Sequence, residues 1–455
     1  MEKKSKLVSG FSKLSKREKL AWLAKNFFSN PEEVASELKS FWYGDTQKQK
    51  IFDNFSENTL SNFYLPYGVM PNLELNGKTY CVPMVIEESS VVAAASSAAK
   101  FWLSRGGFKA EIKATQKVGQ VHFEWKGDSL NLYKMMPQLE ARIVEDTDHI
   151  TSNMRKRGGG ILDIELLDMS HLEQHYYQLK MTFETCDSMG ANFINSTLEA
   201  TGHALVNFMQ EQSQLPSKER HVTIIMAILS NYTPECLVRA SVSCPVKFLG
   251  SFDSGHMDAE TFAYKFVKAT KIAHIDIHRA TTHNKGIFNG IDAVALATGN
   301  DFRAIESCGH TYAARDGKYK SLSYAEIKDG TFHFWLDIPL AIGTVGGLTT
   351  LHPLAKRSLE MLGNPSAEEL MKITAAVGLA QNFAAVRSLV TTGIQKGHMK
   401  MHLKNILNHL NATESEVTAT MSHFSDKIVS FTAVRDFLNL LRKPKITLSC
   451  KLPLS

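Results

Sequence analysis

The chain has 455 residues, of which 44% are hydrophobic and 21% are charged. This length exceeds what one hydrophobic core usually supports, so the sequence predicts two or three lobes. The net charge of +5 is small for such a chain, which disfavours nucleic-acid binding and is compatible with a small polyanionic ligand.

The N-terminus and the cysteines indicate the compartment. The basic first 27 residues lack the apolar segment of a signal peptide. The sequence contains no run of eighteen apolar residues, so we expect no membrane span. The six cysteines are scattered without a Cys-x-x-Cys pair, which favours reduced thiols over a zinc site. We therefore expect a cytoplasmic protein with no metal, no membrane segment and no nucleic-acid partner.

The expected elements mix helices with strands. Residues 1–60 are polar and helical in pattern, and an extended segment at 78–88 leads into an Ala-rich helix at 89–105 that opens with serines in capping positions. Glu87 and Glu88 stand at this junction, where a carboxylate is well placed to meet a ligand. The alternative is that one glutamate caps the helix while the other is solvated.

The pattern of expected elements changes between residues 112 and 230. Strands are expected at 120–125, 161–169, 176–187 and 221–231, and a long amphipathic helix at 189–212. This alternation indicates a small α+β lobe inserted between the two halves of a larger one. After it we expect a strand at 332–343, a pair of helices over about 354–391 and a helix-rich tail at 398–442.

A glycine-containing segment, Cys186-Asp-Ser-Met-Gly-Ala-Asn192, precedes the long helix. Asp187 is expected to cap this helix, and Gly190 allows a ligand to approach the backbone. The free amides of a helix N-terminus bind phosphate oxygens. Any capped helix shows a similar pattern, so this segment alone is a weak signal, and the chain contains no G-x-G-x-x-G motif.

The densest polar segment covers residues 279–303. Lys285 and Asp301 are expected in glycine-punctuated loops on either side of an apolar stretch. Such a spacing could bring the two side chains into one cleft, where mutual pairing would keep the lysine charged and ready to stabilise an oxyanion. The alternative is a pair of surface loops with a solvated lysine.

Near the C-terminus, His398 and His402 are one helical turn apart. Met399 replaces the glutamate of a zinc-protease motif, so zinc binding is not expected. His402 is expected to be structural, whereas His398 follows Gly397 and is better placed to reach a ligand.

Together these segments resemble the class II (soluble, bacterial-type) 3-hydroxy-3-methylglutaryl-coenzyme A (HMG-CoA) reductases. The resemblance extends from about residue 10 to 425 and keeps the family's order. The segments that carry it are ELNGKTYCVPMVIEESSVVAAAS, CDSMGAN, HRATTHNKGIFNGIDAVALATGNDFRAIE, LAIGTVGGLTTLHPLA, VGLAQNFAAVRSL and GIQKGHMKMH.

The resemblance implies an α+β fold with a larger, helix-rich substrate-binding domain made of residues 1–112 and 231–392. A small ferredoxin-like domain for the nicotinamide cofactor is inserted at 113–230, and a helical flap covers 393–455. The implied reaction is the reductive deacylation of HMG-CoA to mevalonate and CoA by two hydride transfers from NAD(P)H. The family's active site crosses a dimer interface, so a homodimer or higher even oligomer is expected.

The resemblance also assigns roles to residues. Glu88 is the general acid, Lys285 stabilises the oxyanion, Asp301 tunes both, and His398 on the mobile flap protonates the departing thiolate. The hydroxymethylglutaryl group would be held by Ser90, Arg279, Asn289 and Gln381. The cofactor would be held by Asp187, Met189, Gly190, Asn192 and Asn231.

A further position concerns the choice of cofactor. NADH-using relatives carry an acidic residue twelve positions before the aspartate that matches Asp163, and this position is Thr151 here, near Arg155, Lys156 and Arg157. Without that carboxylate, a 2′-phosphate is not repelled, so we expect NADPH to be preferred over NADH. Two alternatives stay open: the same enzyme working oxidatively in mevalonate catabolism, and a non-catalytic acyl-CoA-binding relative.

Overall fold

The computed structural model describes residues 6–391, 393, 403–424, 427 and 429–442. Helices combine with one two-stranded and two four-stranded sheets, so the predicted mixture of helices and strands is confirmed. The apolar side chains gather in three separate cores, a large one, one within residues 121–222, and a small C-terminal one.

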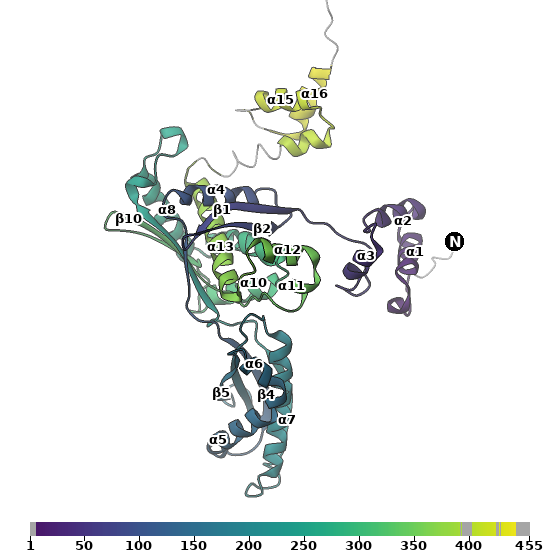
Figure 1. Ribbon diagram of the computed structural model, residues 1–455, viewed down its shortest axis with the longest axis vertical. Coiled ribbons are helices and arrows are strands. Elements are labelled where there is room, and N and C mark those ends of the chain that lie inside the picture. The colour runs from purple at the N-terminus through teal and green to yellow at the C-terminus, as the bar shows by residue number, and fades with distance from the viewer. Residues whose placement is uncertain (1–5, 392, 394–402, 425–426, 428, 443–455) are drawn as a thin grey trace, which may run out of the picture.

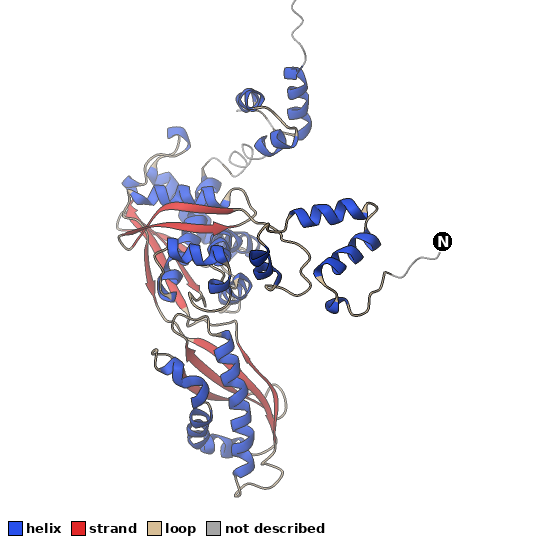
Figure 2. Ribbon diagram, turned by 45° about the vertical axis from the view of Figure 1, so that its right-hand side comes forward, coloured by secondary structure: helices blue, strands red, loops and turns tan. Residues whose placement is uncertain are grey.

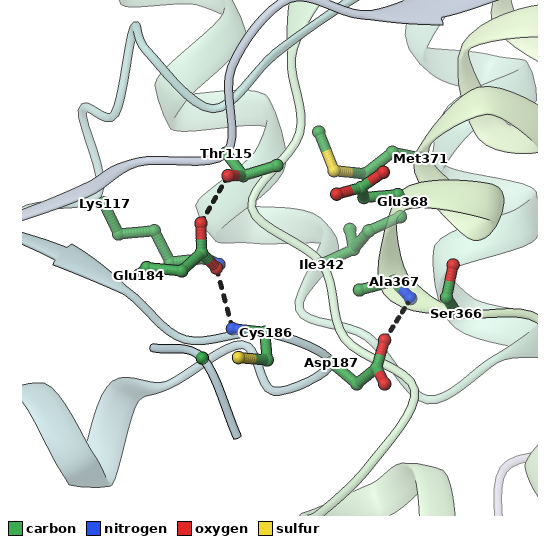
Figure 3. Close-up of a pocket in the computed structure, with 11 residues that line it drawn as sticks. Thr115, Lys117, Glu184, Cys186, Asp187, Ile342, Ser366, Ala367, Glu368 and Met371 are labelled. Carbon is green, nitrogen blue, oxygen red and sulfur yellow. Dashed lines mark hydrogen bonds between the residues drawn. The ribbon is translucent and has the colours of Figure 1, made fainter. Parts of the chain in front are cut away.

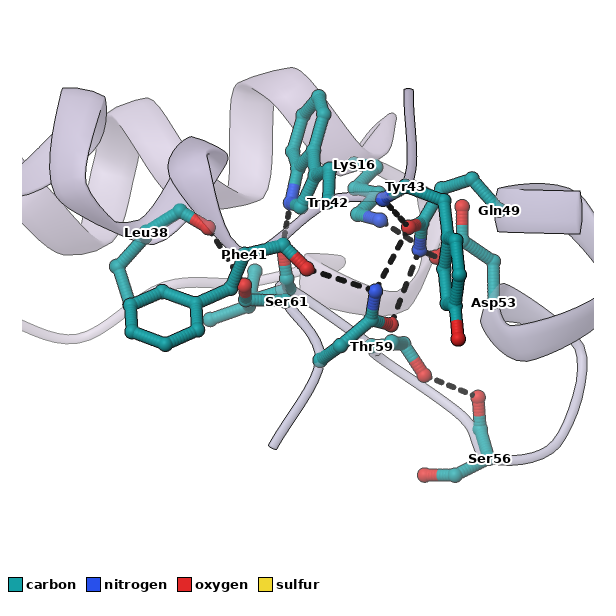
Figure 4. A network of polar contacts seen from close by, with 12 residues as sticks. Lys16, Leu38, Phe41, Trp42, Tyr43, Gln49, Asp53, Ser56, Thr59 and Ser61 are labelled. Carbon is teal, nitrogen blue, oxygen red and sulfur yellow. Dashed lines mark hydrogen bonds and ion pairs between the residues drawn. The ribbon is translucent and has the colours of Figure 1, made fainter. Parts of the chain in front are cut away.

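Three short helices form an N-terminal arm beside the large lobe (Figure 1). They follow a 3₁₀ turn (Phe11–Lys13) and are α1 (Lys16–Phe27), α2 (Pro31–Ser40) and α3 (Thr46–Asp53). Figure 4 shows the polar contacts that join them, among which Lys16 Nζ lies 2.5 Å from the carboxylate of Asp53 and the Trp42 indole donates to the carbonyl of Leu60 at 2.9 Å. The ring of Phe52 on α3 meets the ring of His352, with 5.1 Å between centroids.

A β-hairpin and one helix position the first predicted site residues. Strands β1 (Tyr67–Leu75) and β2 (Lys78–Val85) are antiparallel, and α4 (Val91–Leu103) packs against β1. The predicted strand-to-helix transition is therefore confirmed. The expected serine cap is wrong, because Ser90 occupies the N-cap position in a helical conformation and makes no capping hydrogen bond with its side chain.

The main sheet of the large lobe is antiparallel, with the order β3-β8-β10-β9. Its strands are β3 (Lys109–Ile112), β8 (Leu237–Pro245), β9 (Ser323–Lys328) and β10 (Thr331–Pro339). The helices that follow β8 are α8 (Ala259–Ile275), α9 (Ile277–Ala297), α10 (Phe302–Ala313), α11 (Leu348–Leu351), α12 (Pro353–Met361) and α13 (Ala367–Val390), with 3₁₀ turns at Val246–Phe248 and Asp253–Gly255.

Helices α9 and α13 cross at unusually close range because each carries a glycine at the crossing. A Cβ atom at Gly290 would lie 2.9 Å from Cβ of Gln381, and one at Gly378 would lie 2.8 Å from Cγ1 of Ile291. Helix α13 is long and apolar enough to cross a membrane by composition, but 72% of that apolar stretch is buried inside the protein. It is the central helix of the large lobe.

The small lobe leaves and rejoins the large lobe between two paired strands, β3 and β8. Its elements are β4 (Lys117–Trp125), α5 (Ser129–Asp146), α6 (Asp148–Arg155), β5 (Gly160–Asp168), β6 (Tyr176–Glu184), α7 (Ala191–Glu211) and β7 (Val222–Leu229). The antiparallel sheet order β5-β6-β4-β7 with this βαββαβ sequence is the ferredoxin-like arrangement. In Figure 2 the helices cover one face of this sheet.

The C-terminal segment forms a small helical unit. Helices α15 (Glu414–His423) and α16 (Phe431–Arg442) pack through a core that includes Leu407, Phe424 and Leu438. Figure 1 shows this unit set apart from the large lobe. The predicted helix-rich tail is confirmed over its described part.

Candidate active site

The structure brings Glu88 and Lys285 together. The Lys285 ammonium donates a hydrogen bond to Oε2 of Glu88 at 2.9 Å. Both side chains stay accessible, at 62% for the lysine and 36% for the glutamate, so a ligand can reach either. A cation beside a carboxylate can stabilise a developing negative charge while the carboxyl group delivers or accepts a proton.

The expected loop conformation of Lys285 is wrong. Lys285 lies in the middle of α9, which runs unbroken from Ile277 to Ala297. The glycines that suggested a loop are helical positions, and Gly290 is needed there because α13 crosses at that point. Tertiary packing has overridden the local preference of glycine for turns.

The expected pairing of Lys285 with Asp301 is also wrong within one chain. Asp301 caps the N-terminus of α10, where its carboxylate accepts from the amides of Arg303 and Ala304 and pairs with the Arg303 guanidinium at 3.0 Å. Twelve residues of continuous helix separate Lys285 from the end of α9, a rise of about 18 Å. Asp301 therefore belongs to a different part of the molecular surface.

The predicted substrate-binding residues Ser90, Asn289 and Gln381 lie on three helices that pack together, α4, α9 and α13. Ser90, the N-cap of α4, is two residues after Glu88, and Asn289 lies one turn after Lys285 on the same face of α9. Gln381 on α13 packs against α9 at Gly290. Its side chain is only 5% exposed, and its Oε1 atom has no hydrogen-bond partner. A buried orphan acceptor of this kind is rare and fits a group that a ligand satisfies.

Arg279, in the first turn of α9, is half-buried, and burial lowers the pKa of its guanidinium. No carboxylate of the described residues forms an ion pair with it. Within the described part of the chain, its guanidinium forms a hydrogen bond to Nδ1 of His283 at 3.5 Å. A partly desolvated, unpaired guanidinium is a suitable receptor for a ligand carboxylate.

A second cluster lies at the N-terminus of α7. A pocket of about 310 Å³ contains Met189, Gly190 and Asn192 together with Asp301. Gly190 has φ of 88°, and a Cβ atom there would lie 2.5 Å from Cγ2 of Thr185, so only glycine fits. No side chain caps α7. The helix therefore presents its first amides to the pocket, an arrangement that suits phosphate oxygens.

Asp187 does not cap α7, contrary to the expectation. Its Oδ1 atom accepts a hydrogen bond of 2.8 Å from the amide of Ala367, in the first turn of α13. Figure 3 shows this contact in a pocket of about 510 Å³ between the lobes. On the opposite wall the buried Lys117 donates to Oγ1 of Thr185 at 2.6 Å. Asp187 thus joins the loop before α7 to the large lobe.

The two remaining cofactor candidates differ in accessibility. Asn231 lines a small pocket with Met189 and Ala191. Thr151 on α6 is only 1% exposed, and its hydroxyl donates to the carbonyl of Thr147 at 3.1 Å. The Arg155 guanidinium donates to the same hydroxyl at 3.3 Å and pairs with the carboxylate of Asp148. Buried Thr151 is therefore poorly placed to contact a cofactor itself. Its hydroxyl instead holds the guanidinium of Arg155, which is the more accessible group.

His398 lies outside the described residues. Among the described residues, no three His, Cys, Asp or Glu side chains are grouped to hold a metal ion. The residue-level predictions missed one wall of the 310 Å³ pocket, which consists of Gly343, residues 345–349 and Asn300. The Asn300 side chain accepts from the amide of Gly343 at 2.8 Å, and the glycine pair at 346 and 347 was the signal available in the sequence.

Comparisons with known proteins agree with this arrangement. The family model "Hydroxymethylglutaryl-coenzyme A reductase" matches residues 15–403. The 3-hydroxy-3-methylglutaryl-coenzyme A reductase of Archaeoglobus fulgidus is 36% identical over 417 residues, covering 91% of this chain and 89% of the relative. A probable reductase of the same name from Borreliella burgdorferi is 33% identical, covering 90% of both chains.

Solved structures give the same result. A 3-hydroxy-3-methylglutaryl-coenzyme A reductase from Streptococcus pneumoniae aligns with a TM-score of 0.68 and 37% identity, covering 96% of this chain and 100% of that one. A class II reductase from the same organism, bound to NADPH in open conformations, aligns with a TM-score of 0.68 and 37% identity, over 84% of this chain.

The two-lobed α+β fold, with a lysine–carboxylate pair on one lobe and a glycine-lined helix N-terminus beside the other, defines a class of oxidoreductase. The chain belongs to the hydroxymethylglutaryl-coenzyme A reductase family, as its sequence segments predict. The reaction of this family is the reduction of HMG-CoA in the mevalonate pathway.

Proposed function

We propose that this chain reduces HMG-CoA to mevalonate and CoA with two molecules of a nicotinamide cofactor, at a site completed by a second copy of the chain. The observation that carries the proposal is the 2.9 Å contact between Lys285 and Glu88. Arg279, which has no carboxylate partner among the described residues, and the orphaned amide oxygen of Gln381 support it, because the hydroxymethylglutaryl group brings a carboxylate and a hydroxyl that would satisfy them.

Each proposed role follows from the chemistry of the side chain. Lys285 stabilises the negative charge that develops on the thioester oxygen, and Glu88 supplies the proton that this oxygen takes up. Arg279 holds the terminal carboxylate of the substrate, and Ser90, Asn289 and Gln381 orient the remainder. His398 protonates the departing CoA thiolate. Asp301 adjusts the protonation of the Glu88–Lys285 pair.

The glycine-lined pocket suits a dinucleotide. The open N-terminus of α7 would hold its phosphates, and the open space beside Gly346 and Gly347 on the facing wall lets a ligand approach the backbone. Met189, Asn192 and Asn231 would contact the nicotinamide half. The nicotinamide supplies the hydride for each reduction step. Asp187 supports the pocket from outside through its contact with α13.

Two copies of the chain are required by this proposal. Lys285 lies in the middle of α9, whereas Asp301 lies beyond the C-terminal end of this helix, and the part of α9 between them rises about 18 Å. One carbonyl group can contact both only if a second chain supplies one of them. Exposed apolar side chains offer surface for such a partner, among them Phe63 at 91% exposure, in the segment that joins the N-terminal arm to β1. A homodimer or a higher even oligomer satisfies this requirement.

We also propose that the cofactor is NADPH. Thr151 replaces a carboxylate that would repel the 2′-phosphate, and Arg155 lies next to it. The test is the loss of reduced-cofactor absorbance when the purified protein is mixed with HMG-CoA and either NADPH or NADH. Higher kcat/KM with NADPH is expected, and Arg155→Ala should reduce this value roughly tenfold without affecting NADH. Arg142→Ala, on α5, is the matched control.

A preference for NADH would overturn the cofactor assignment, and no turnover with either cofactor would overturn the proposed reaction. The complete Glu88–Lys285 pair favours an enzyme over a non-catalytic acyl-CoA-binding protein. The same groups serve the oxidative direction, so the forward and reverse rates should both be measured. We retain the domain limits 1–112 with 231–392, 113–230 and 393–455, and a cytoplasmic location, as parts of the proposal.

A further inference from the structure

A buried polar chain runs beneath the substrate side of the site. His283, Ser323 and Asn382 are almost completely buried and come from α9, β9 and α13. Nε2 of His283 lies 2.6 Å from Oγ of Ser323, and this hydroxyl donates to Oδ1 of Asn382 at 2.7 Å. The amide of Asn382 returns to the backbone carbonyl of His283 at 3.4 Å. The chain thus closes on itself across three elements.

The hydrogen-bond directions assign one tautomer to His283. The Arg279 guanidinium can only donate, so Nδ1 of His283, 3.5 Å from it, must be an acceptor. The proton of the neutral ring then lies on Nε2 and is donated to Ser323, whose own hydrogen is free for Asn382. Burial, together with the charge of Arg279, lowers the pKa of His283 to about 3, which keeps the ring neutral.

The neutral ring beside Arg279 has a physical consequence. A carboxylate in that position would neutralise the guanidinium and compete with an anionic ligand. An imidazole lone pair instead restrains the guanidinium while leaving its charge available. The chain also connects the elements that carry the other proposed substrate contacts, because His283 is two residues from Lys285 and Asn382 is next to Gln381.

We propose that His283 is a positioning residue: its neutral Nδ1 atom orients the Arg279 guanidinium toward the terminal carboxylate of the substrate, and Ser323 and Asn382 hold the ring in place. This inference rests on the proposed function. His283 does not touch the substrate, and its effect is on the affinity for a substrate that carries a carboxylate. Loss of the Nδ1 acceptor should therefore leave the affinity for the cofactor unchanged.

Two substitutions separate the nitrogens of the ring. His283→Gln places an amide near the former Nε2 and retains a donor for Ser323, but it removes the acceptor facing Arg279. His283→Asn places its side-chain oxygen near the former Nδ1 and retains that acceptor, but it loses the bond to Ser323. We expect the Gln variant to raise the KM for HMG-CoA about tenfold with the KM for NADPH unchanged. The Asn variant should restore a KM near that of the wild type with a lower Tm.

The control is His310→Gln, which alters a half-buried histidine on α10, bonded to the Tyr319 hydroxyl at 2.7 Å. It should leave the KM for HMG-CoA unchanged. As a second readout, we compare the KM of wild type and His283→Gln for the acyl-CoA analogue that lacks the terminal carboxylate. The two values should be similar, because Arg279 then has no anion to bind. This comparison remains decisive if His283→Asn does not fold.

The outcomes are distinct. Two results would show that His283 supports only the fold and would overturn the inference. One is an equal KM for HMG-CoA in the Gln and Asn variants, and the other is a rise in KM of His283→Gln that is as large for the carboxylate-free analogue as for HMG-CoA. A wild-type protein that does not oxidise NADPH in the presence of HMG-CoA overturns the proposed function instead.

Discussion

The ammonium of Lys285 lies 2.9 Å from the carboxylate of Glu88, although 197 positions separate these residues in the chain. The contact joins the start of α4 to the middle of α9. Both groups are exposed enough to exchange this bond for one to a ligand. Their separation in sequence means that the fold of the large lobe creates the pair.

Replacing Lys285 with alanine should abolish most turnover. The variant removes the cation that we propose stabilises the developing oxyanion, so we expect kcat to fall by about 10²- to 10³-fold. HMG-CoA binding, measured by isothermal titration, should be retained in large part, because Arg279 and Gln381 remain. Lys328→Ala, at the exposed end of β9, is the control. Turnover within tenfold of wild type would exclude the role given to Lys285.

Mixing two inactive variants tests whether the site is shared between chains. Asp301→Asn keeps a capping side chain for α10 and so should fold normally, but it loses the carboxylate. If Lys285 and Asp301 come from different chains, a dimer of one Lys285→Ala and one Asp301→Asn chain has one intact site. Random exchange of subunits should restore about a quarter of the wild-type activity. No recovery after proven exchange contradicts a shared site.

The crossing of α9 and α13 predicts opposite effects for two glycines on one helix. In Gly290→Ala the new methyl group meets Cβ of Gln381 and the carbonyl of Val377, both at 2.9 Å. Unfolding should therefore cost about 1–3 kcal/mol less than in the wild type. Gly286→Ala has no atom within 4 Å of the new Cβ and should gain up to about 1 kcal/mol from helix propensity. Urea denaturation at one protein concentration measures both.

Asp292 on α9 predicts a pH-dependent stability. Burial first, and the negative charge of Glu306 second, raise the pKa of its carboxyl group from 3.8 to about 8. Between these two values the folded protein holds a proton that the unfolded chain has released. Raising the pH therefore favours unfolding, by at most about 1.4 kcal/mol per pH unit.

Asp292→Asn removes this titration and keeps the shape of the side chain. The Tm of the variant should exceed that of the wild type by an amount that grows from pH 5 to pH 8 and then levels off. Thermal unfolding followed by circular dichroism across this range measures the difference. A difference that is constant with pH would show that Asp292 ionises in the folded protein as it does in water.

Much of this protein follows from local sequence. The strand-to-helix transition before α4, the long helix α7 and the strands of the small lobe were predictable because the periodicity of apolar residues and the position of glycines reflect short-range constraints. The order of the motifs also identified the family, since a chain of matching segments is far more specific than any one of them.

Only the tertiary structure decided how the site residues are paired. Glycines around Lys285 suggested loops, yet they lie inside α9 because α13 needs close approach there. Asp187 accepts from an amide in the first turn of α13 instead of capping the neighbouring α7, and Lys285 meets Glu88 instead of Asp301. These choices depend on which distant elements pack together. Such long-range contacts leave no periodic signal in the sequence around either partner.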